Sequence, residues 1–154
     1  MAAKTPAIAA AERAGVPFTL HEYELDPNAD AFGLEAAEKL GFDPARVFKT
    51  LVVSLDGALA FALVPAHAHL DLGRLGKRAR LADKQQAERT TGSVAGGISP
   101  IAPRKPLPVH LDASALDHDT VVVNGGRRGL QIELAPADLV ALTNAKVAPI
   151  AALR

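Results

Sequence analysis

Residues 47–65 constrain the fold more than any other part of the sequence. Two apolar runs rich in Val, Leu and Ala lie on either side of Asp56-Gly57. Asp-Gly between β-prone runs is a strong signal for a two-residue hairpin, because both turn positions require a positive φ. We therefore predict antiparallel strands at about residues 47–55 and 58–64.

The remaining predicted elements are short. Thr5-Pro6 is typical of a helix start, with Thr as the N-cap and Pro in the first turn, and Gly15 ends that helix. Further helices are predicted over 34–40, 71–80, 83–88 and 136–142, and strands over 18–25, 109–111, 120–123 and 130–134. These elements do not follow a regular βαβ alternation. We expect one α+β domain over residues 1–154, with a mixed, mainly antiparallel sheet flanked by short helices.

Composition excludes several classes of protein. The chain has 154 residues, of which 49% are hydrophobic but only 4% aromatic, so the core must consist mainly of aliphatic side chains. Because there is no Cys, disulfides, thiolate metal sites and a cysteine nucleophile are excluded. No apolar run is long enough to cross a bilayer, and the N-terminus lacks the pattern of a secretory signal. We expect a cytoplasmic protein.

The net charge is zero, but the charges are unevenly distributed. Residues 1–72 contain 10 acidic and 5 basic residues, whereas residues 73–154 contain 7 and 12. Such a basic half is compatible with a surface that binds a nucleic-acid backbone, or with a solvated helix face. Charge alone leaves both interpretations open. The densest basic run is Arg74, Lys77, Arg78, Arg80, Lys84 and Arg89.

Lys49 is the unusual residue of the predicted hairpin. Alternation along a strand places it on the same face as Val47, Leu51 and Val53. A lysine on an apolar face either extends its ammonium group to solvent or lines a cleft. In a cleft it could hold a phosphate, a carbonyl oxygen or a carboxylate.

Two glycine-rich segments are candidate ligand loops. Gly96-Gly97-Ile98-Ser99-Pro100 could direct backbone N–H groups at a ligand, since glycine has no Cβ to block the approach, or it could be a tight turn. Residues 124–129 include Arg127 and Arg128. This segment is either a hairpin connection or a loop whose two arginines contact phosphate.

Familiar catalytic motifs are missing from the sequence. It contains no Gly-x-Ser-x-Gly elbow, no phosphate-binding P-loop and no dinucleotide fingerprint. His67 and His69 form a His-x-His pair, but no convincing third ligand accompanies them, so we interpret them as surface or loop residues and expect no metal and no cofactor. A hydrolase built on this chain would have to use water or a substrate group as its nucleophile.

Four segments in order resemble the YbaK-type aminoacyl-tRNA deacylases. They are Val47-Phe48-Lys49-Thr50-Leu51-Val52-Val53, Thr91-Gly92 with residues 96–100, residues 124–130, and Ile132-Glu133-Leu134. Thr5-Pro6-Ala7, Tyr23 and Phe32-Gly33 fall in matching order near the start. The resemblance extends from about residue 5 to residue 150.

The resemblance implies a trans-editing hydrolase, related to the editing domain of bacterial prolyl-tRNA synthetases. Its expected substrate is Cys-tRNA(Pro), because cysteine is close to proline in size and a second, hydrolytic site supplies the missing discrimination. The substrate thiol or water would attack the ester. The implied partners are aminoacyl-tRNA and prolyl-tRNA synthetase, without DNA or a membrane. The alternatives are a sister editing enzyme for Ala- or Ser-tRNA and a non-catalytic module that binds tRNA or a synthetase.

The resemblance also implies roles for individual residues. Lys49 would contact the terminal adenosine or its phosphate and the aminoacyl end. The family pattern leads us to expect a small hydroxyl at Asn124 and an acid at Gln131, and these departures bear on substrate preference. The implied substrate-binding residues are Tyr23, Phe32, Thr50, Gly96, Gly97, Ile98, Asn124 and Gly125, and the implied tRNA-binding residues are Arg74, Lys77, Arg78, Arg127 and Arg128.

Overall fold

The central element is the predicted hairpin. The computed structural model describes residues 4–26, 32–94 and 96–152. In it, β2 (Phe48–Leu55) and β3 (Ala58–Pro65) pair antiparallel along their whole length. Asp56 and Gly57 have φ values of 54° and 91°, as the two-residue turn requires. The sequence prediction is confirmed here to within a residue.

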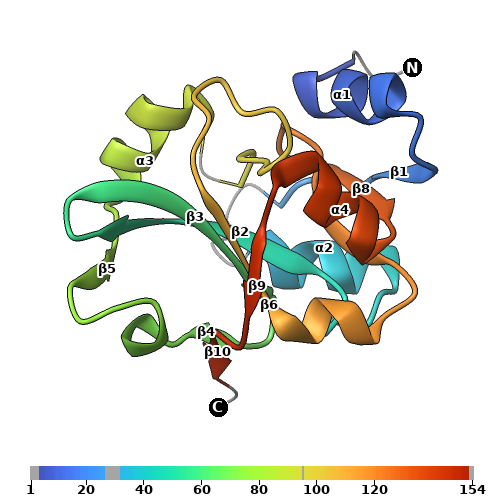
Figure 1. Cartoon of the computed structure of the whole chain (residues 1–154). Helices are drawn as coiled ribbons and strands as arrows, with labels where there is room; N and C mark the ends of the chain where they lie inside the picture. Colours follow the sequence, from blue (N-terminus) through green and yellow to red (C-terminus); the bar gives the residue numbers. More distant parts are fainter. Residues whose placement is uncertain (1–3, 27–31, 95, 153–154) are drawn as a thin grey trace.

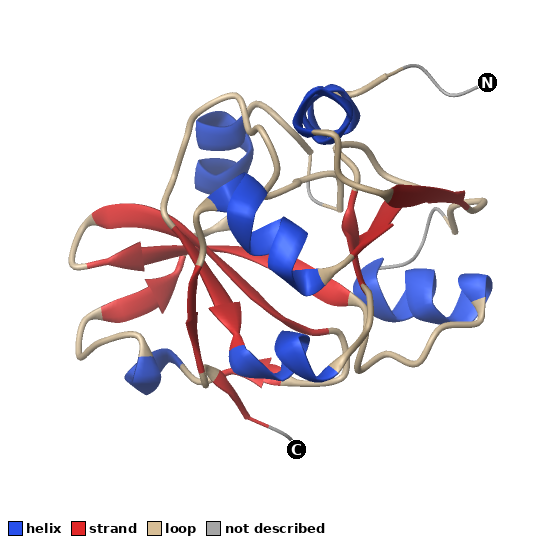
Figure 2. Cartoon of the chain, turned by 45° about the vertical axis from the view of Figure 1, so that its right-hand side comes forward, coloured by secondary structure: helices blue, strands red, loops and turns tan. Residues whose placement is uncertain are grey.

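The hairpin belongs to a five-stranded mixed sheet in the order β5-β2-β3-β6-β9. β5 (Ala79–Leu81) pairs antiparallel with β2, whereas β6 (Val109–Asp112) and β9 (Lys146–Ala148) continue the sheet as parallel strands. These strands fan out from one side of the molecule in Figure 2. Buried clusters lie on both sheet faces, which accounts for the almost uninterrupted apolar runs of β2 and β3.

The other strands of the described residues form two smaller sheets. β1 (Phe18–Glu22), β8 (Leu130–Leu134) and β7 (Val121–Asn124) form an antiparallel sheet in that order, and β4 (His69–Leu70) pairs with β10 (Ala151–Ala152). A parallel bridge between Val47 and Val122 joins the start of the hairpin to β7. The α+β architecture with a mixed sheet therefore agrees with the prediction.

The helices are short and lie around the sheets (Figure 1). They are α1 (Pro6–Ala14), α2 (Phe32–Leu40), α3 (Lys84–Thr91) and α4 (Pro136–Thr143), with 3-10 turns at Leu72–Arg74 and Ala113–Asp117. Thr5 caps α1, since its hydroxyl accepts a hydrogen bond from the Ile8 N–H. Within the described residues, no helix has the length and apolar character needed to cross a membrane.

The helix predicted over residues 71–80 is wrong. Only the 3-10 turn forms there, and the chain then enters β5, which pairs with the end of β2. Two glycines interrupt this segment, and Gly76 has a φ of 151°, outside the helical region. The basic residues of this segment therefore do not share a helix face.

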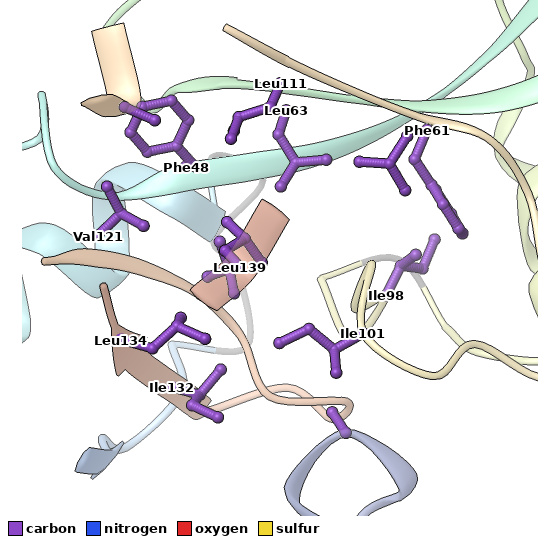
Figure 3. Packing of buried hydrophobic residues seen from close by; sticks show 14 of the residues in the cluster. Phe48, Phe61, Leu63, Ile98, Ile101, Leu111, Val121, Ile132, Leu134 and Leu139 are labelled. Atoms are coloured by element: carbon purple, nitrogen blue, oxygen red, sulfur yellow. The ribbon is translucent and has the colours of Figure 1, made fainter. Parts of the chain in front are cut away.

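The main core lies between the five-stranded sheet, the three-stranded sheet and α4. Figure 3 shows Leu139 of α4 surrounded by side chains from both sheets and from the loop that carries Ile98 and Ile101. On the opposite face of the large sheet, Val53 lies in a second cluster with Leu51 and Leu55 packed against it. This second cluster occupies the strand face that the sequence assigned to Lys49.

Candidate active site

A cavity of about 580 Å³ lies at the end of the hairpin where β2 begins. Its volume is in the usual range for small-ligand sites. Five segments contribute to its wall: the start of β2, the β3–β4 connection, the first turn of α2, the loop after α3, and the adjoining β7 and β8. The lining residues are Gly33, Leu34, Phe48, Lys49, Thr50, Leu51, Ala66, His67, Ala68, His69, Gly96, Ile98, Asn124 and Gln131.

Lys49 is half-buried in this wall, opposite Val64 in the strand ladder. The first turn of α2 rests directly on the hairpin beside it. A Cβ placed on Gly33 would lie 3.1 Å from the Ala66 Cβ and 3.5 Å from the Lys49 Cβ. A larger residue at position 33 would crowd the hairpin, so the glycine favours the close approach of helix and strand beside the lysine.

Asn124 holds the two glycine-bearing loops together. Its side-chain amide nitrogen donates to the Gly96 carbonyl at 2.7 Å and to the Arg127 carbonyl at 3.1 Å. Its side-chain oxygen accepts from the Gly126 N–H at 2.7 Å. The side chain is buried, so these bonds are shielded from water. Both loops are thereby fixed at the same wall of the cavity.

Gly97 lies behind the cavity wall rather than in it. Its N–H donates to the Val94 carbonyl at 2.9 Å. A Cβ on Gly97 would lie 3.1 Å from the backbone nitrogen of Arg128, so the loop packs directly against the backbone of the late turn. The structure thus brings together Lys49 and the two loops that the sequence singled out.

Thr50 and Ile98 also line the cavity. The Thr50 hydroxyl is buried, and it has no hydrogen-bond partner among the described residues. A buried hydroxyl without a partner costs roughly 1–3 kcal/mol. A ligand that pairs with this group would recover that cost.

Tyr23 lies behind Gln131, and only Gln131 reaches the cavity. The two side chains are hydrogen-bonded. Burial, followed by the nearby Glu35 carboxylate, raises the pKa of Tyr23 above its ordinary value, so its hydroxyl remains protonated at neutral pH. Tyr23 therefore contacts a residue of the cavity wall without lining the cavity itself.

Gly125 and Phe32 complete the predicted substrate-binding set. Gly125 is buried below the cavity wall, where its carbonyl accepts a hydrogen bond from the Thr5 hydroxyl at 2.5 Å. Phe32 is the first residue of α2, and its side chain lies outside the described part of the chain.

The predicted tRNA-binding residues are not part of the cavity lining. Arg78 is paired with Asp56 at the hairpin tip, with 3.1 Å between Nη1 and Oδ1. Leu55, the last residue of β2 before the tip, is six residues from Lys49, which corresponds to about 20 Å along the strand. Arg127 forms an ion pair of 2.8 Å with Glu22. Of the other predicted tRNA-binding residues, Arg74 and Lys77 are exposed beside β5, and Arg128 is half-buried in the late turn.

The sequence interpretation missed the two histidines of the cavity. His67 and His69 are exposed and line it, although they were interpreted as surface or loop residues without a role. The available signal was their position just after the strand that pairs with Lys49. Leu34, exposed on the first turn of α2, was missed in the same way.

Comparison with known proteins identifies the family. The sequence profile of the aminoacyl-tRNA editing domain matches residues 26–142. A proposed Cys-tRNA(Pro)/Cys-tRNA(Cys) deacylase of Enterococcus faecalis, EbsC, is 37% identical over 154 residues, which span 96% of this chain and 93% of EbsC. A proline–tRNA ligase of Shouchella clausii is 35% identical over 83 residues, or 51% of this chain and 14% of the ligase.

The fold agrees with these sequence matches. The crystal structure of a proposed trans-editing enzyme for prolyl-tRNA synthetase superimposes with a TM-score of 0.81 at 28% identity, and the match covers 94% of each chain. The domain profile, a relative matched over nearly its whole length and the shared fold point to the same group. The chain therefore belongs to the aminoacyl-tRNA editing domain family, the deacylases of mischarged tRNA.

Proposed function

We propose that the protein hydrolyses Cys-tRNA(Pro) in trans, with residues 1–154 acting as one editing domain in the cytoplasm. The observation that carries this proposal is the shared cavity, whose wall includes a lysine, a glycine loop and the asparagine that fixes that loop. The named activity of EbsC, a relative over nearly the whole chain, supports the choice of substrate.

Lys49 and Thr50 are the groups suited to stabilise the transition state. Attack on an ester carbonyl places negative charge on its oxygen, and a donor aimed at that charge is worth 10²–10³ in rate, roughly. The Gly97 N–H and the Gly96 carbonyl already bond to Val94 and Asn124. The glycine loop therefore shapes the wall, and the ammonium and hydroxyl groups contact the ester.

The nucleophile comes from the substrate or from water. For a cysteinyl ester, the substrate sulfur bonds to the carbonyl carbon, the bond from that carbon to the ribose oxygen breaks, and the thiol proton ends on the ribose oxygen. Water then opens the resulting cyclic thiolactone, which gives free cysteine. No cysteine, serine or carboxylate is present among the described lining residues to replace it. The cavity then needs only to position the ester and stabilise its charge.

The basic residues outside the cavity bind the tRNA backbone in this proposal. Arg74, Lys77 and Arg78 lie on an exposed surface near the hairpin tip, and Arg127 and Arg128 lie in the late turn. Arginine and lysine at such positions contact phosphates without reading sequence. Prolyl-tRNA synthetase is the proposed protein partner, since the mischarged tRNA is the product of its error.

A panel of tRNA(Pro) charged with Cys, Ala, Ser or Pro tests the activity. We expect rapid release of Cys and slow release of the others. Preferred release of Ala or Ser would identify a sister editing enzyme, and no release at all would identify a non-catalytic tRNA-binding module. Co-elution with prolyl-tRNA synthetase in size-exclusion chromatography, with and without tRNA, tests the partner separately.

A further inference from the structure

We propose that His67 and His69 bind the phosphate of the 3′-terminal nucleotide and so fix the direction in which the substrate enters the cavity. This inference rests on the proposed function, because it concerns an aminoacylated RNA end. Neither histidine has a role in the catalytic steps described above.

The local backbone presents both imidazoles to the cavity. The Ala66 N–H donates to the Val47 carbonyl at 2.7 Å, which extends the hairpin ladder by one more pair. The Ala68 N–H then donates to the Pro65 carbonyl at 2.9 Å and closes a turn. Ala68 is only 2% exposed, whereas the histidines on either side are exposed and line the cavity. The small residue thus anchors the turn, and the two rings face outward.

The ionisable side chains of the described cavity wall are all basic residues. Among the described lining residues these groups are Lys49, His67 and His69, and no Asp or Glu accompanies them. A wall lined by one sign of charge concentrates ligand groups of the opposite sign. The cavity is therefore built for an anion beside the histidines.

An aminoacylated adenosine has charged groups of both signs, which decides its orientation. Its phosphate is anionic, whereas the α-amino group of the amino acid is cationic when protonated. The imidazole N–H groups of His67 and His69 can donate to the phosphate oxygens, whereas no carboxylate among the described lining residues is present beside them to pair with the amino group. The side-chain amides of Asn124 and Gln131 form another part of the wall, where the amino acid can lie.

A comparison of two RNAs on two proteins tests the subsite. The RNAs are uncharged minihelices ending in CCA, one with the natural phosphate before the terminal adenosine and one with a neutral methylphosphonate there. The proteins are the wild type and the double variant His67→Gln/His69→Gln, with His118→Gln as the matched control. His118 lies at the end of a 3-10 turn and does not line the cavity.

For the wild type and for His118→Gln, neutralising the phosphate should raise the Kd about tenfold, as expected for a charge-assisted contact. For the double variant, the Kd for the natural RNA should already be raised, and neutralisation should add less than about threefold. An equal increase in all three proteins, or no increase in the wild type, would overturn the subsite. Because uncharged RNA is used, this result is independent of whether Cys-tRNA(Pro) is hydrolysed.

Discussion

The side-chain amide of Asn124 donates to the Gly96 carbonyl at 2.7 Å, although 28 residues separate the two in sequence. This bond connects the end of β7 to the loop after α3, and both residues line the cavity. The shape of the proposed substrate site therefore depends on one buried side chain.

Replacing that amide should loosen the loop. In Asn124→Asp, the carboxylate cannot donate to the Gly96 and Arg127 carbonyls, so two buried acceptors lose their partner. We expect a loss of about 2–3 kcal/mol in the free energy of unfolding and a larger proportional loss of deacylation. Urea denaturation and turnover assays measure both. Asn144→Asp, at the exposed end of α4, is the control, and equal behaviour of the two variants would contradict the role of Asn124.

Gly97→Ala should separate the two loops. The new Cβ would meet the backbone of Arg127 and Arg128 at 3.1–3.3 Å, and a backbone cannot give way as cheaply as a flexible side chain. We expect destabilisation of about 1–3 kcal/mol and impaired turnover. In Gly73→Ala the nearest contact is 3.4 Å, to the Asp71 carboxylate, so both properties should change little. Unchanged stability and turnover in Gly97→Ala would show that the loops are not in tight contact.

Lys49→Met should abolish most of the activity without unfolding the protein. Methionine keeps much of the aliphatic stem but removes the ammonium group, so kcat should fall by about 10²-fold or more. Circular dichroism and single-turnover kinetics on Cys-tRNA(Pro) check fold and rate. Lys105→Met, in an exposed loop, should retain wild-type kinetics. A kcat within a few-fold of wild type for Lys49→Met would remove this residue from the catalytic step.

Asp112 should make stability depend on pH in acid. Burial raises the pKa of this carboxyl, but hydrogen bonds from Ser114, Ile150 and Ala151 outweigh burial and leave the pKa below its ordinary value of 3.8. A depressed pKa stabilises the folded state above the unfolded-state pKa, and this contribution is lost as pH falls through the folded-state pKa. We expect Asp112→Asn to be less stable than wild type by about 2–3 kcal/mol at pH 6.

The difference between wild type and Asp112→Asn should then shrink below about pH 4. Urea unfolding at several pH values measures it, and Asp117→Asn, which changes an exposed carboxyl, serves as the control. A difference that stays constant down to pH 2.5 would mean that Asp112 does not contribute through its charge.

The surface beside β5 should determine part of the salt dependence of tRNA binding. Each neutralised phosphate contributes roughly 0.7–0.9 to the slope of log K against log salt concentration. The triple variant Arg74→Ala/Lys77→Ala/Arg78→Ala should therefore reduce the slope by about 2–3. Fluorescence anisotropy between low and high salt measures this slope. Arg13→Ala, which changes an exposed residue of α1, is the control. An unchanged slope would assign the backbone contacts elsewhere.

Much of the fold was predictable from local patterns. Asp56-Gly57 determined the hairpin, and Thr5-Pro6 with Gly15 determined α1, because in both cases the signal is contained in neighbouring residues. The short strands β9 and β10 were missed since they contain only a few residues and depend on distant partners. Residues 71–80 carry a basic pattern typical of a helix, but their two glycines, Gly73 and Gly76, favour a turn and a short strand.

The candidate site was predictable in its parts but not in its connections. Lys49, Gly96 and Asn124 were each singled out, and the structure places them around one cavity. The bond from Asn124 to Gly96 could not be read from sequence, because it depends on the packing of two loops. His67 and His69 were dismissed since a His-x-His pair suggests a metal, and no third ligand accompanied it.

The Thr5 hydroxyl caps α1 and also donates to the Gly125 carbonyl, next to Asn124 in the chain. The N-cap of α1 is thus hydrogen-bonded to the backbone of the late turn beside the cavity wall. Replacing Thr5, or fusing an affinity tag directly to Pro6, should disturb turnover even though neither change alters a residue that lines the cavity.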